Sequence, residues 1–146
     1  MLLLQPSSAL TDLARDTASR HSLDAGLVCA MIEQESAWDP HAIRYEPGFR
    51  LRYVAPLRLP PSEEIARSIS WGLMQVMGQL ARERGFSGKF LSALCDPATG
   101  LDIGCTVLAS KLSAANGDAA QAIALWNGGA NANYAPQVLA RLARYR

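Results

Sequence analysis

Residues 31–40, with the sequence MIEQESAWDP, have the pattern of an apolar helix that ends in a carboxylate and a turn. Leu27 and Met31 have the spacing of a buried helical stripe. Glu35 continues this stripe, because it lies four residues after Met31 and eight after Leu27. Glu33 lies about 200° from Glu35 around the helix axis, at about 100° per residue. We therefore expect Glu35 to face an apolar groove and Glu33 to face solvent.

The expected position gives Glu35 the chemistry of a general acid. Apolar surroundings disfavour the charged form of a carboxyl group, so the pKa of Glu35 would rise and the group would carry a proton near neutral pH. The alternative is an exposed or salt-bridged Glu35 at an ordinary helix end, and the short motif alone favours this alternative. The choice depends on the rest of the chain.

The size and composition fit one soluble globular domain over residues 1–146. The chain is 49% hydrophobic and 18% charged, and it is long enough to bury a core. Its 14 basic and 13 acidic residues give a net charge of +1, which offers no support for nucleic-acid binding. Since no apolar run approaches the length of a membrane span, we expect no membrane insertion.

The cysteines and histidines give no indication of a metal or a cofactor. Cys29, Cys95 and Cys105 show no CxxC or Cys/His spacing, so we expect neither kind of site. Cys29 is expected in the core, whereas the sequence leaves open whether Cys95 and Cys105 pair. Residues 1–4 are apolar but few and lack a basic segment, so we expect no signal peptide.

Helical periodicity and start signals predict a mainly α fold. Asp96-Pro97 and Asp118 are helix starts, and no segment alternates over the length of a strand. The longer expected helices cover about residues 8–21, a stretch from Ser22 or Asp24 to Glu35, and residues 97–116, 119–126 and 133–145. Shorter helical segments are expected to begin at residues 62–65, to follow Gly78 and end at Arg84, and to run from Ser87 to near Cys95. Residues 41–61 contain four prolines and are expected to form a long irregular loop, which in a small domain is often functional.

Three stretches together resemble the soluble lytic transglycosylase family, which has a lysozyme-like fold. They are Glu35-Ser36, residues 72–75 (GLMQ) and residues 125–129 (LWNGG), with Tyr134 beyond. In that family a Glu-Ser pair ends a core helix, a Gly-Leu-Met-Gln segment follows, and an aromatic-Asn-x-Gly turn comes after an Ala-rich helix. The resemblance covers about residues 8–145. Residues 44–49 (RYEPGF) are similar to a branch found among phage and prophage members, which are endolysin-like.

The residue types in these stretches suit a site for sugars. Gly72 would let backbone approach a ligand closely, and Gln75 can donate to and accept from an acetamido group. Ser68 or Ser70 could replace a family serine near the catalytic glutamate. The candidate substrate-binding residues are Ser36, Ser70, Gly72, Leu73, Met74, Gln75, Met77, Trp126, Asn127, Tyr134 and Tyr45.

Several of these residues also have a purely structural interpretation. Leu73 and Met77, four residues apart, could equally be core, and so could Trp126 at the end of an apolar helix. Ser36 could be a local helix cap, Asn127 part of a helix stop, and Tyr134 an anchor for the last helix. The aromatic side chains could instead stack on sugar faces.

The resemblance implies a mechanism in which Glu35 acts twice. It would protonate the oxygen between N-acetylmuramic acid and N-acetylglucosamine in peptidoglycan, then accept the proton of the muramoyl C6 hydroxyl as a 1,6-anhydro ring closes. This chemistry needs no second carboxylate, whereas hydrolysis would need one, for which Asp39 and Glu46 are candidates. The family turn usually carries a Tyr whose hydroxyl bonds near the glutamate. This chain has Trp126 there, so Tyr134 or the loop tyrosines supply that contact or it is absent.

Two alternatives remain at this stage. One is a hydrolytic lysozyme of the goose type, a muramidase that uses water. The other is a non-catalytic wall-binding or virion assembly module, against which an apolar-facing Glu35 argues. We expect a monomer that acts on the bacterial cell wall in the periplasm, after holin-type release from the cytoplasm or as part of a virion. The sequence leaves open the host, the cross-link preference and exo or endo action.

Overall fold

A computed structural model describes residues 6–128 and 131–146, and the prediction of a mainly α fold is confirmed. Residues 1–4 and Gly129 of the expected turn lie outside the described residues. The helices of the larger lobe are α1 (Ser8–Arg20), α2 (Ala25–Ser36), α7 (Ala119–Trp126) and α8 (Tyr134–Arg141), followed by a 3-10 turn (Leu142–Arg144). Helix α6 (Pro97–Ala114) connects this lobe to a smaller one.

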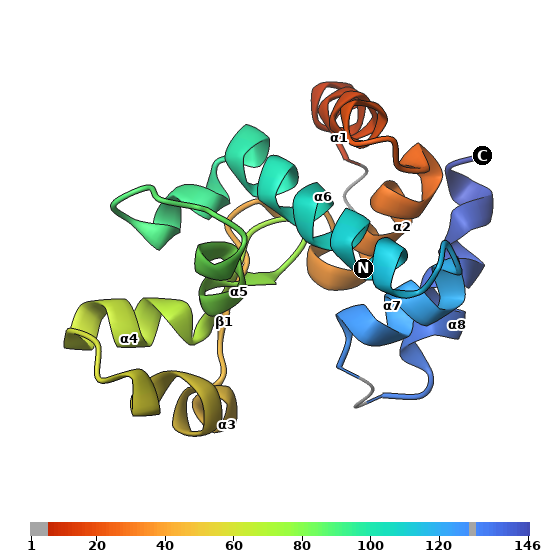
Figure 1. Ribbon diagram of the computed structural model, residues 1–146. Coiled ribbons are helices and arrows are strands. Elements are labelled where there is room, and N and C mark those ends of the chain that lie inside the picture. Colours follow the sequence, from red (N-terminus) through yellow and green to blue (C-terminus); the bar gives the residue numbers. More distant parts are fainter. Residues whose placement is uncertain (1–5, 129–130) are drawn as a thin grey trace.

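A local side-chain cap sets the start of α1, α2, α6 and α7, whereas Asn133 before α8 makes no such bond. Oδ1 of Asp24 accepts from the backbone N–H of Gly26 at 2.9 Å, so α2 is capped by Asp24 rather than Ser22. Asp96 and Asp118 cap α6 and α7 in the same way, as the sequence predicted. Helix α6 crosses the middle of the molecule between the two lobes (Figure 1).

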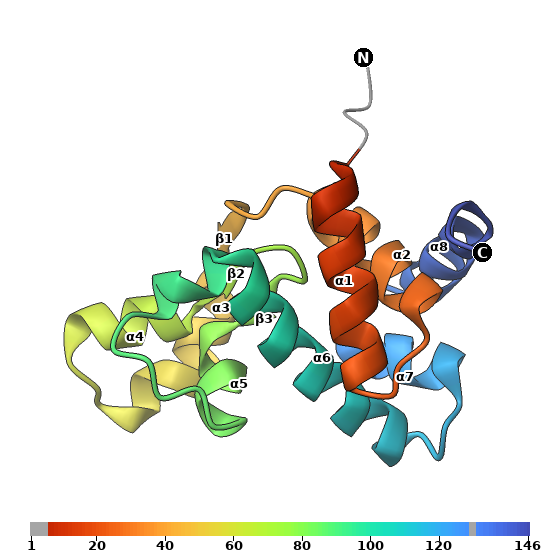
Figure 2. The ribbon, with the colours of Figure 1, turned by 90° about the horizontal axis from the view of Figure 1, so that it is seen from above.

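Helix α2 is the centre of the larger lobe. Its residues 27–32 are all at most 3% exposed, because α1 covers one side and α8 the other. Figure 2 shows α1 lying across both α2 and α6. Cys29 lies in this core, and all three cysteines are free, so Cys95 and Cys105 do not pair. The end of α2 therefore emerges directly from the core, which is where Glu35 lies.

The smaller lobe contains a short antiparallel sheet that the sequence analysis did not predict. Its order is β1 (Ile43–Tyr45), β2 (Ile69–Trp71) and β3 (Val76–Met77), with Arg44 opposite Ser70 and Ser70 opposite Met77. Strands of two or three residues are too short to show alternation in a sequence. The helical segments around the sheet are α3 (Pro47–Phe49), α4 (Pro61–Arg67), α5 (Gly78–Glu83) and a 3-10 turn (Leu91–Cys95).

The expectation of an irregular loop over residues 41–61 is wrong. After β1 the chain forms α3, a π-helical turn (Arg50–Val54) and a 3-10 turn (Ala55–Leu57) before it enters α4. Proline breaks a helix interior but suits a helix start, where its missing N–H is not needed, and Pro47 and Pro61 each occupy such a position. Fully buried Val54 and an Arg50–Glu64 ion pair hold the segment against α4.

Candidate active site

Glu35 lies in the last turn of α2 and faces a pocket of about 550 Å³ between the two lobes. The helix ends immediately after it, because Ala37 and Trp38 adopt left-handed backbone conformations with φ of 51° and 67°. The pocket is lined by Glu35, Arg44, Glu46, Phe49, Ser70, Gln75, Met77, Trp126 and Asn127. Among the predicted site residues, the structure thus brings Glu35, Ser70, Gln75, Met77, Trp126 and Asn127 together.

One oxygen of the Glu35 carboxyl group is held by two uncharged donors. The indole Nε1–H of Trp126 donates to Oε1 at 3.2 Å, and the hydroxyl of Tyr134 donates to the same oxygen. Within the described part of the chain, Oε2 accepts no hydrogen bond. The donors come from α7 and α8, so two helices far along the chain complete the surroundings of this carboxyl group.

The electrostatics of the site favour a protonated Glu35. Burial raises the pKa of Glu35 above its ordinary value, and the hydrogen bonds from Tyr134 and Trp126 and the charge of Arg44 offset this only in part. Burial and the neighbouring Glu35 also raise the pKa of Tyr134, so its hydroxyl keeps its proton and acts as a donor. A half-buried carboxyl group with two neutral donors on one oxygen can present its proton from the other.

Glu33 does not face solvent, contrary to our expectation. Its side chain is 13% exposed, and it accepts from Arg141 Nη1 at 2.9 Å, from Arg144, and from the Tyr145 hydroxyl at 2.9 Å. The expectation was wrong because α8 and the turn after it cover this face of α2. The basic C-terminal residues are thereby used in ion pairs within the molecule.

The aromatic residues at the site have different roles. Tyr134 is 6% exposed, so its ring is buried and only its hydroxyl serves the site; stacking on a sugar face is excluded. Trp126 is partly buried against the core and also lines the pocket. The contact expected from the family tyrosine is therefore supplied by Tyr134 and Trp126 together.

Gln75 and Ser70 form a closed hydrogen-bonded unit at the pocket wall. Gln75 has a left-handed backbone with φ of 51°, and its Nε2 donates to the carbonyls of Ala42 (2.8 Å) and Gly72 (2.9 Å). Its Oε1 accepts from the Ser70 hydroxyl at 3.0 Å. Both amide hydrogens are thus used inside the protein, and the expected donation from Gln75 to an acetamido group does not fit this arrangement.

The other residues of the 72–75 segment serve packing rather than the pocket. Gly72 has φ of 73°, and a side chain there would lie 2.5 Å from the carbonyl oxygen of Leu94, so the close approach is to protein and not to a ligand. Leu73 and Met74 are each 1% exposed, and Met74 packs on Gly104 of α6. The expectation that these three residues contact substrate is corrected accordingly.

Two more predicted residues lie apart from the Glu35 carboxyl group. The Ser36 hydroxyl donates to the carbonyls of Ile32 (3.1 Å) and Leu73 (2.8 Å), which ties the end of α2 to the segment after β2. Tyr45 is 44% exposed, accepts from Arg50 at 3.1 Å, and lines a separate pocket of about 370 Å³ on the smaller lobe. Ser68, fully buried, donates to the carbonyl of Glu64.

Three residues of the pocket were not among the predicted substrate-binding residues, namely Arg44, Glu46 and Phe49, and of these only Glu46 was considered, as a candidate second carboxylate. Arg44, in β1, and Glu46, directly after this strand, form an ion pair at 2.9 Å. Their signal was present in residues 44–49, but it was attributed to a loop and not to a strand that returns to the end of α2. Glu46 is a second carboxylate in the pocket, and it is paired with a cation.

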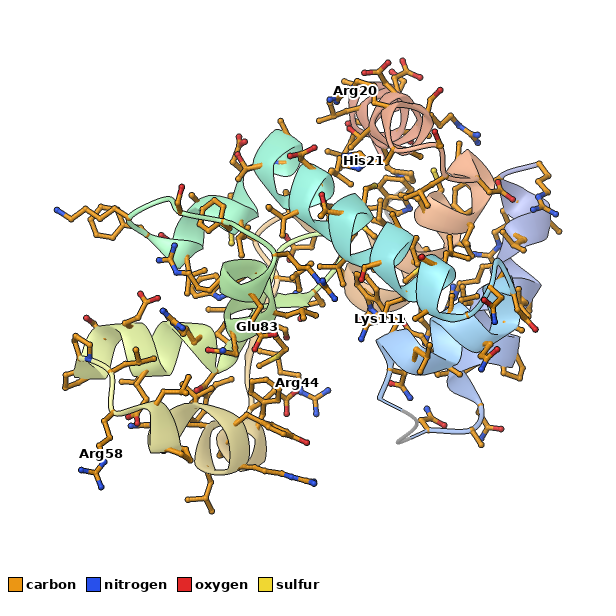
Figure 3. The ribbon with its side chains drawn as sticks, in the orientation of Figure 1. Arg20, His21, Arg44, Arg58, Glu83 and Lys111 are labelled. Atoms are coloured by element: carbon orange, nitrogen blue, oxygen red, sulfur yellow. The ribbon has the colours of Figure 1, made fainter. Side chains whose placement is uncertain are left out.

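A second pocket of about 580 Å³ adjoins the first. The two pockets share Phe49, Met77, Trp126 and Asn127, so they form one groove between the lobes. The second pocket extends to Lys111 on α6 and Glu83 on α5. Figure 3 shows Arg44 and Lys111 reaching toward the opening between the lobes from opposite sides.

In residues 6–128 and 131–146, no cluster of three or more His, Cys, Asp or Glu side chains is arranged to hold a metal ion. His21 forms a hydrogen bond with Asp102 at 2.7 Å, and His41 is exposed in the turn that follows α2. None of the helices in this described part is both long and apolar enough to cross a membrane.

Comparison with known proteins gives one family. The family model described as "Transglycosylase SLT domain" matches residues 12–139, which include most of α1, most of α8 and every element between them. No curated protein and no solved structure gave a significant match. The match spans Glu35, both pockets and the two donors to the Glu35 carboxyl group.

Proposed function

The chain belongs to the transglycosylase SLT domain family, which acts on peptidoglycan, and we propose that it is a lytic transglycosylase in which Glu35 is both the general acid and the general base. The bond cleaved is the β-1,4 bond between N-acetylmuramic acid and N-acetylglucosamine. The product carries a 1,6-anhydromuramic acid end. The sugars on either side of the bond lie beside Glu35, in the first of the two adjoining pockets.

In the first step, Glu35 protonates the leaving oxygen. Its proton resides on Oε2, because Oε1 already accepts from Trp126 and Tyr134. Transfer of this proton to the glycosidic oxygen breaks its bond to the muramoyl anomeric carbon and leaves Glu35 ionised. The two neutral donors stabilise the carboxylate formed, since a hydrogen bond to the charged form favours it.

In the second step, the ionised Glu35 accepts the proton of the muramoyl C6 hydroxyl. The C6 oxygen attacks the anomeric carbon and closes the anhydro ring, and Oε2 is again protonated. No water is consumed, and Glu35 is ready for the next bond. One carboxyl group whose pKa is raised by burial can give up a proton in the first step and take one back in the second, which is why the environment of Glu35 suits this reaction.

The observation that carries this proposal is that the two carboxyl groups at the pocket have different surroundings. Glu35 is buried against uncharged donors, and its pKa is raised. Glu46, the other carboxylate that lines the pocket, is held by Arg44 at 2.9 Å. A hydrolytic enzyme of the goose type would need a second carboxylate free to activate water. Asp39, the other candidate, does not line the Glu35 pocket.

Analysis of the sugar ends tests the proposal. Purified peptidoglycan is digested and the products are analysed by mass spectrometry with and without borohydride treatment. Transglycosylation gives ends one water lighter than those of hydrolysis, and these ends are inert to borohydride. Reducible ends would contradict the proposal and would assign a role to Glu46, which the Glu46→Gln variant would then test.

We also propose a biological setting for this activity. Residues 44–49 suggest a phage or prophage member that degrades the wall during lysis or entry. Wall lysis by purified protein added to permeabilised cells, compared with the Glu35→Gln variant, tests the activity this setting requires.

A further inference from the structure

The second pocket contains a cation to which the described residues offer no anionic partner. Lys111 lies half-buried on α6, and the described residues place no carboxylate within ion-pair distance of it. The other cation that lines the groove, Arg44, is paired with Glu46. A half-buried ammonium group gains from an anionic partner, and here that partner has to come from the ligand.

We propose that this second pocket binds the stem peptide of peptidoglycan, with Lys111 pairing with a peptide carboxylate. The inference rests on the proposed substrate. In intact peptidoglycan the N-acetylated sugars are neutral, and the lactyl carboxyl group of muramic acid is tied up in the amide bond to the peptide. Free carboxylates therefore belong to the stem peptides.

The rest of the pocket suits a short peptide more than a further sugar. Phe49 and Tyr53 pack with ring centroids 5.0 Å apart and form one wall, and Leu80 of α5 and Leu125 of α7 also line the pocket. Tyr53 and Leu125 are 50% and 40% exposed, so an apolar surface is open beside Lys111. The methyl and alkyl side chains of a stem peptide would cover this surface, and removing apolar surface from water favours binding.

Glu83 adds a charge of the opposite sign on the other side of the pocket. It is exposed on α5 and accepts from Gln79 at 3.0 Å, and the described residues give it no cationic partner. The pocket thus presents an ammonium and a carboxylate on two rigid helices. This pair is complementary to a peptide residue that carries both a free carboxylate and a free amine, as the diamino acid of a stem peptide does.

The position of the pocket relates it to the reaction. It shares Trp126, Asn127, Met77 and Phe49 with the pocket of Glu35, so a peptide bound there is attached to a strand whose sugars lie beside the catalytic group. Phe49 and Tyr53 belong to the 41–61 segment. That segment therefore supplies the peptide-binding wall.

Binding measurements in the Glu35→Gln background test the proposal without involving product chemistry. The probes are two soluble fragments of the same glycan strand: one with intact stem peptides, and one from which an amidase has removed them and left free lactyl carboxylates. Lys111→Met is expected to weaken binding of the peptide-bearing fragment about tenfold and to leave the stripped fragment unchanged. Lys89→Met is a matched control, since Lys89 is the only other lysine and lies outside both pockets.

Three outcomes would overturn the proposal. Equal binding of the peptide-bearing fragment by the Lys111→Met variant and its parent would show that Lys111 makes no such pair. An equal loss on both fragments would assign Lys111 to the glycan or to the fold, and a loss on the stripped fragment alone would assign it to the lactyl carboxylate. Reducible ends in the product assay would contradict the proposed reaction and leave this binding result standing.

Discussion

Glu33 and Glu35 lie two residues apart at the end of α2, and their surroundings are opposite in kind. Glu33 is enclosed by two guanidinium groups and a tyrosine hydroxyl, whereas Glu35 is enclosed by an indole and a tyrosine hydroxyl. The charged partners of Glu33 tie the chain end to α2. Neutral partners and burial leave Glu35 able to carry a proton.

The comparison shows that the elements covering a helix decide the chemistry of its carboxylates. Both side chains leave the same helix, and neither has a partner within α2. Arg141 lies 108 residues beyond Glu33, and Tyr134 lies 99 residues beyond Glu35. Two carboxyl groups whose environments differ in this way can take different roles in one small domain.

Replacing each glutamate by glutamine should separate these roles most strongly. Glu35→Gln removes the transferable proton and is expected to lower the rate of wall cleavage by about 10³-fold, within the range for a general acid. Glu33→Gln keeps the pocket and is expected to retain most of the activity. The measurement is release of soluble product from labelled peptidoglycan.

Comparable losses in the two variants would contradict the comparison. Both proteins should first be shown to be folded, by circular dichroism and a thermal melt. Binding of the two variants to insoluble peptidoglycan should be equal, because neither substitution alters the groove surface beyond the Glu35 carboxyl group.

Tyr134→Phe should have the next largest effect on activity. The Tyr134 hydroxyl donates to Glu35, and a hydrogen bond to a charged group contributes about 1.5–3 kcal/mol, so a roughly tenfold to hundredfold loss in rate is expected. The same bond lowers the pKa of Glu35, so its removal raises that pKa further. Because the protonated form starts the reaction, the alkaline limb of the kcat/KM profile should move to higher pH.

Trp126→Phe is the matched control for this variant, since it removes the second donor to the same oxygen. That bond is 3.2 Å long, and we expect a smaller loss and a smaller shift in the same direction. If Tyr134→Phe kept the parent pH profile, the hydroxyl would be structural and would not contribute to the pKa of Glu35.

The local signals in the sequence predicted the helices well. Asp24, Asp96 and Asp118 cap α2, α6 and α7, because a cap depends only on residues two or three positions away. The stripe that leads to Glu35 was equally local, and it correctly brought this residue to the edge of the core. The stripe could not predict which residues of other helices contact Glu35.

The errors arose where distant segments meet. Gly72 has the open backbone that the sequence suggested, but what approaches it is the Leu94 carbonyl, from a turn that no local pattern connects with it. Glu33 was expected in solvent because a helical wheel shows one helix and not the chain end that packs on it. The prolines of residues 41–61 indicated a loop, although two of them start helices.

Glu33→Gln, which is expected to retain most of the activity, should lower the stability of the fold. The Glu33 side chain is 13% exposed while its partners Arg141 and Arg144 are 34% and 59% exposed, so solvent screens the pairs in part. We expect a loss of about 1–2 kcal/mol in the free energy of unfolding, between the values for exposed and buried pairs. Urea denaturation at neutral pH measures it. Arg20→Gln, which breaks an exposed Arg20–Asp16 pair on α1, is the control and should change stability by less than about 0.5 kcal/mol.

Glu35→Gln should have the smallest effect on stability, and in the opposite direction. The pKa of Glu35 is raised in the folded protein above its ordinary value of 4.5, so the folded state disfavours the ionised form. The parent protein therefore loses stability as pH rises through the folded pKa, whereas a glutamine at this position does not titrate. We expect the variant to melt above the parent at pH 7, with the difference narrowing toward pH 4. A difference that stayed constant between these pH values would mean that Glu35 is not desolvated, and the contrast with Glu33 would then reduce to the identity of their hydrogen-bond donors.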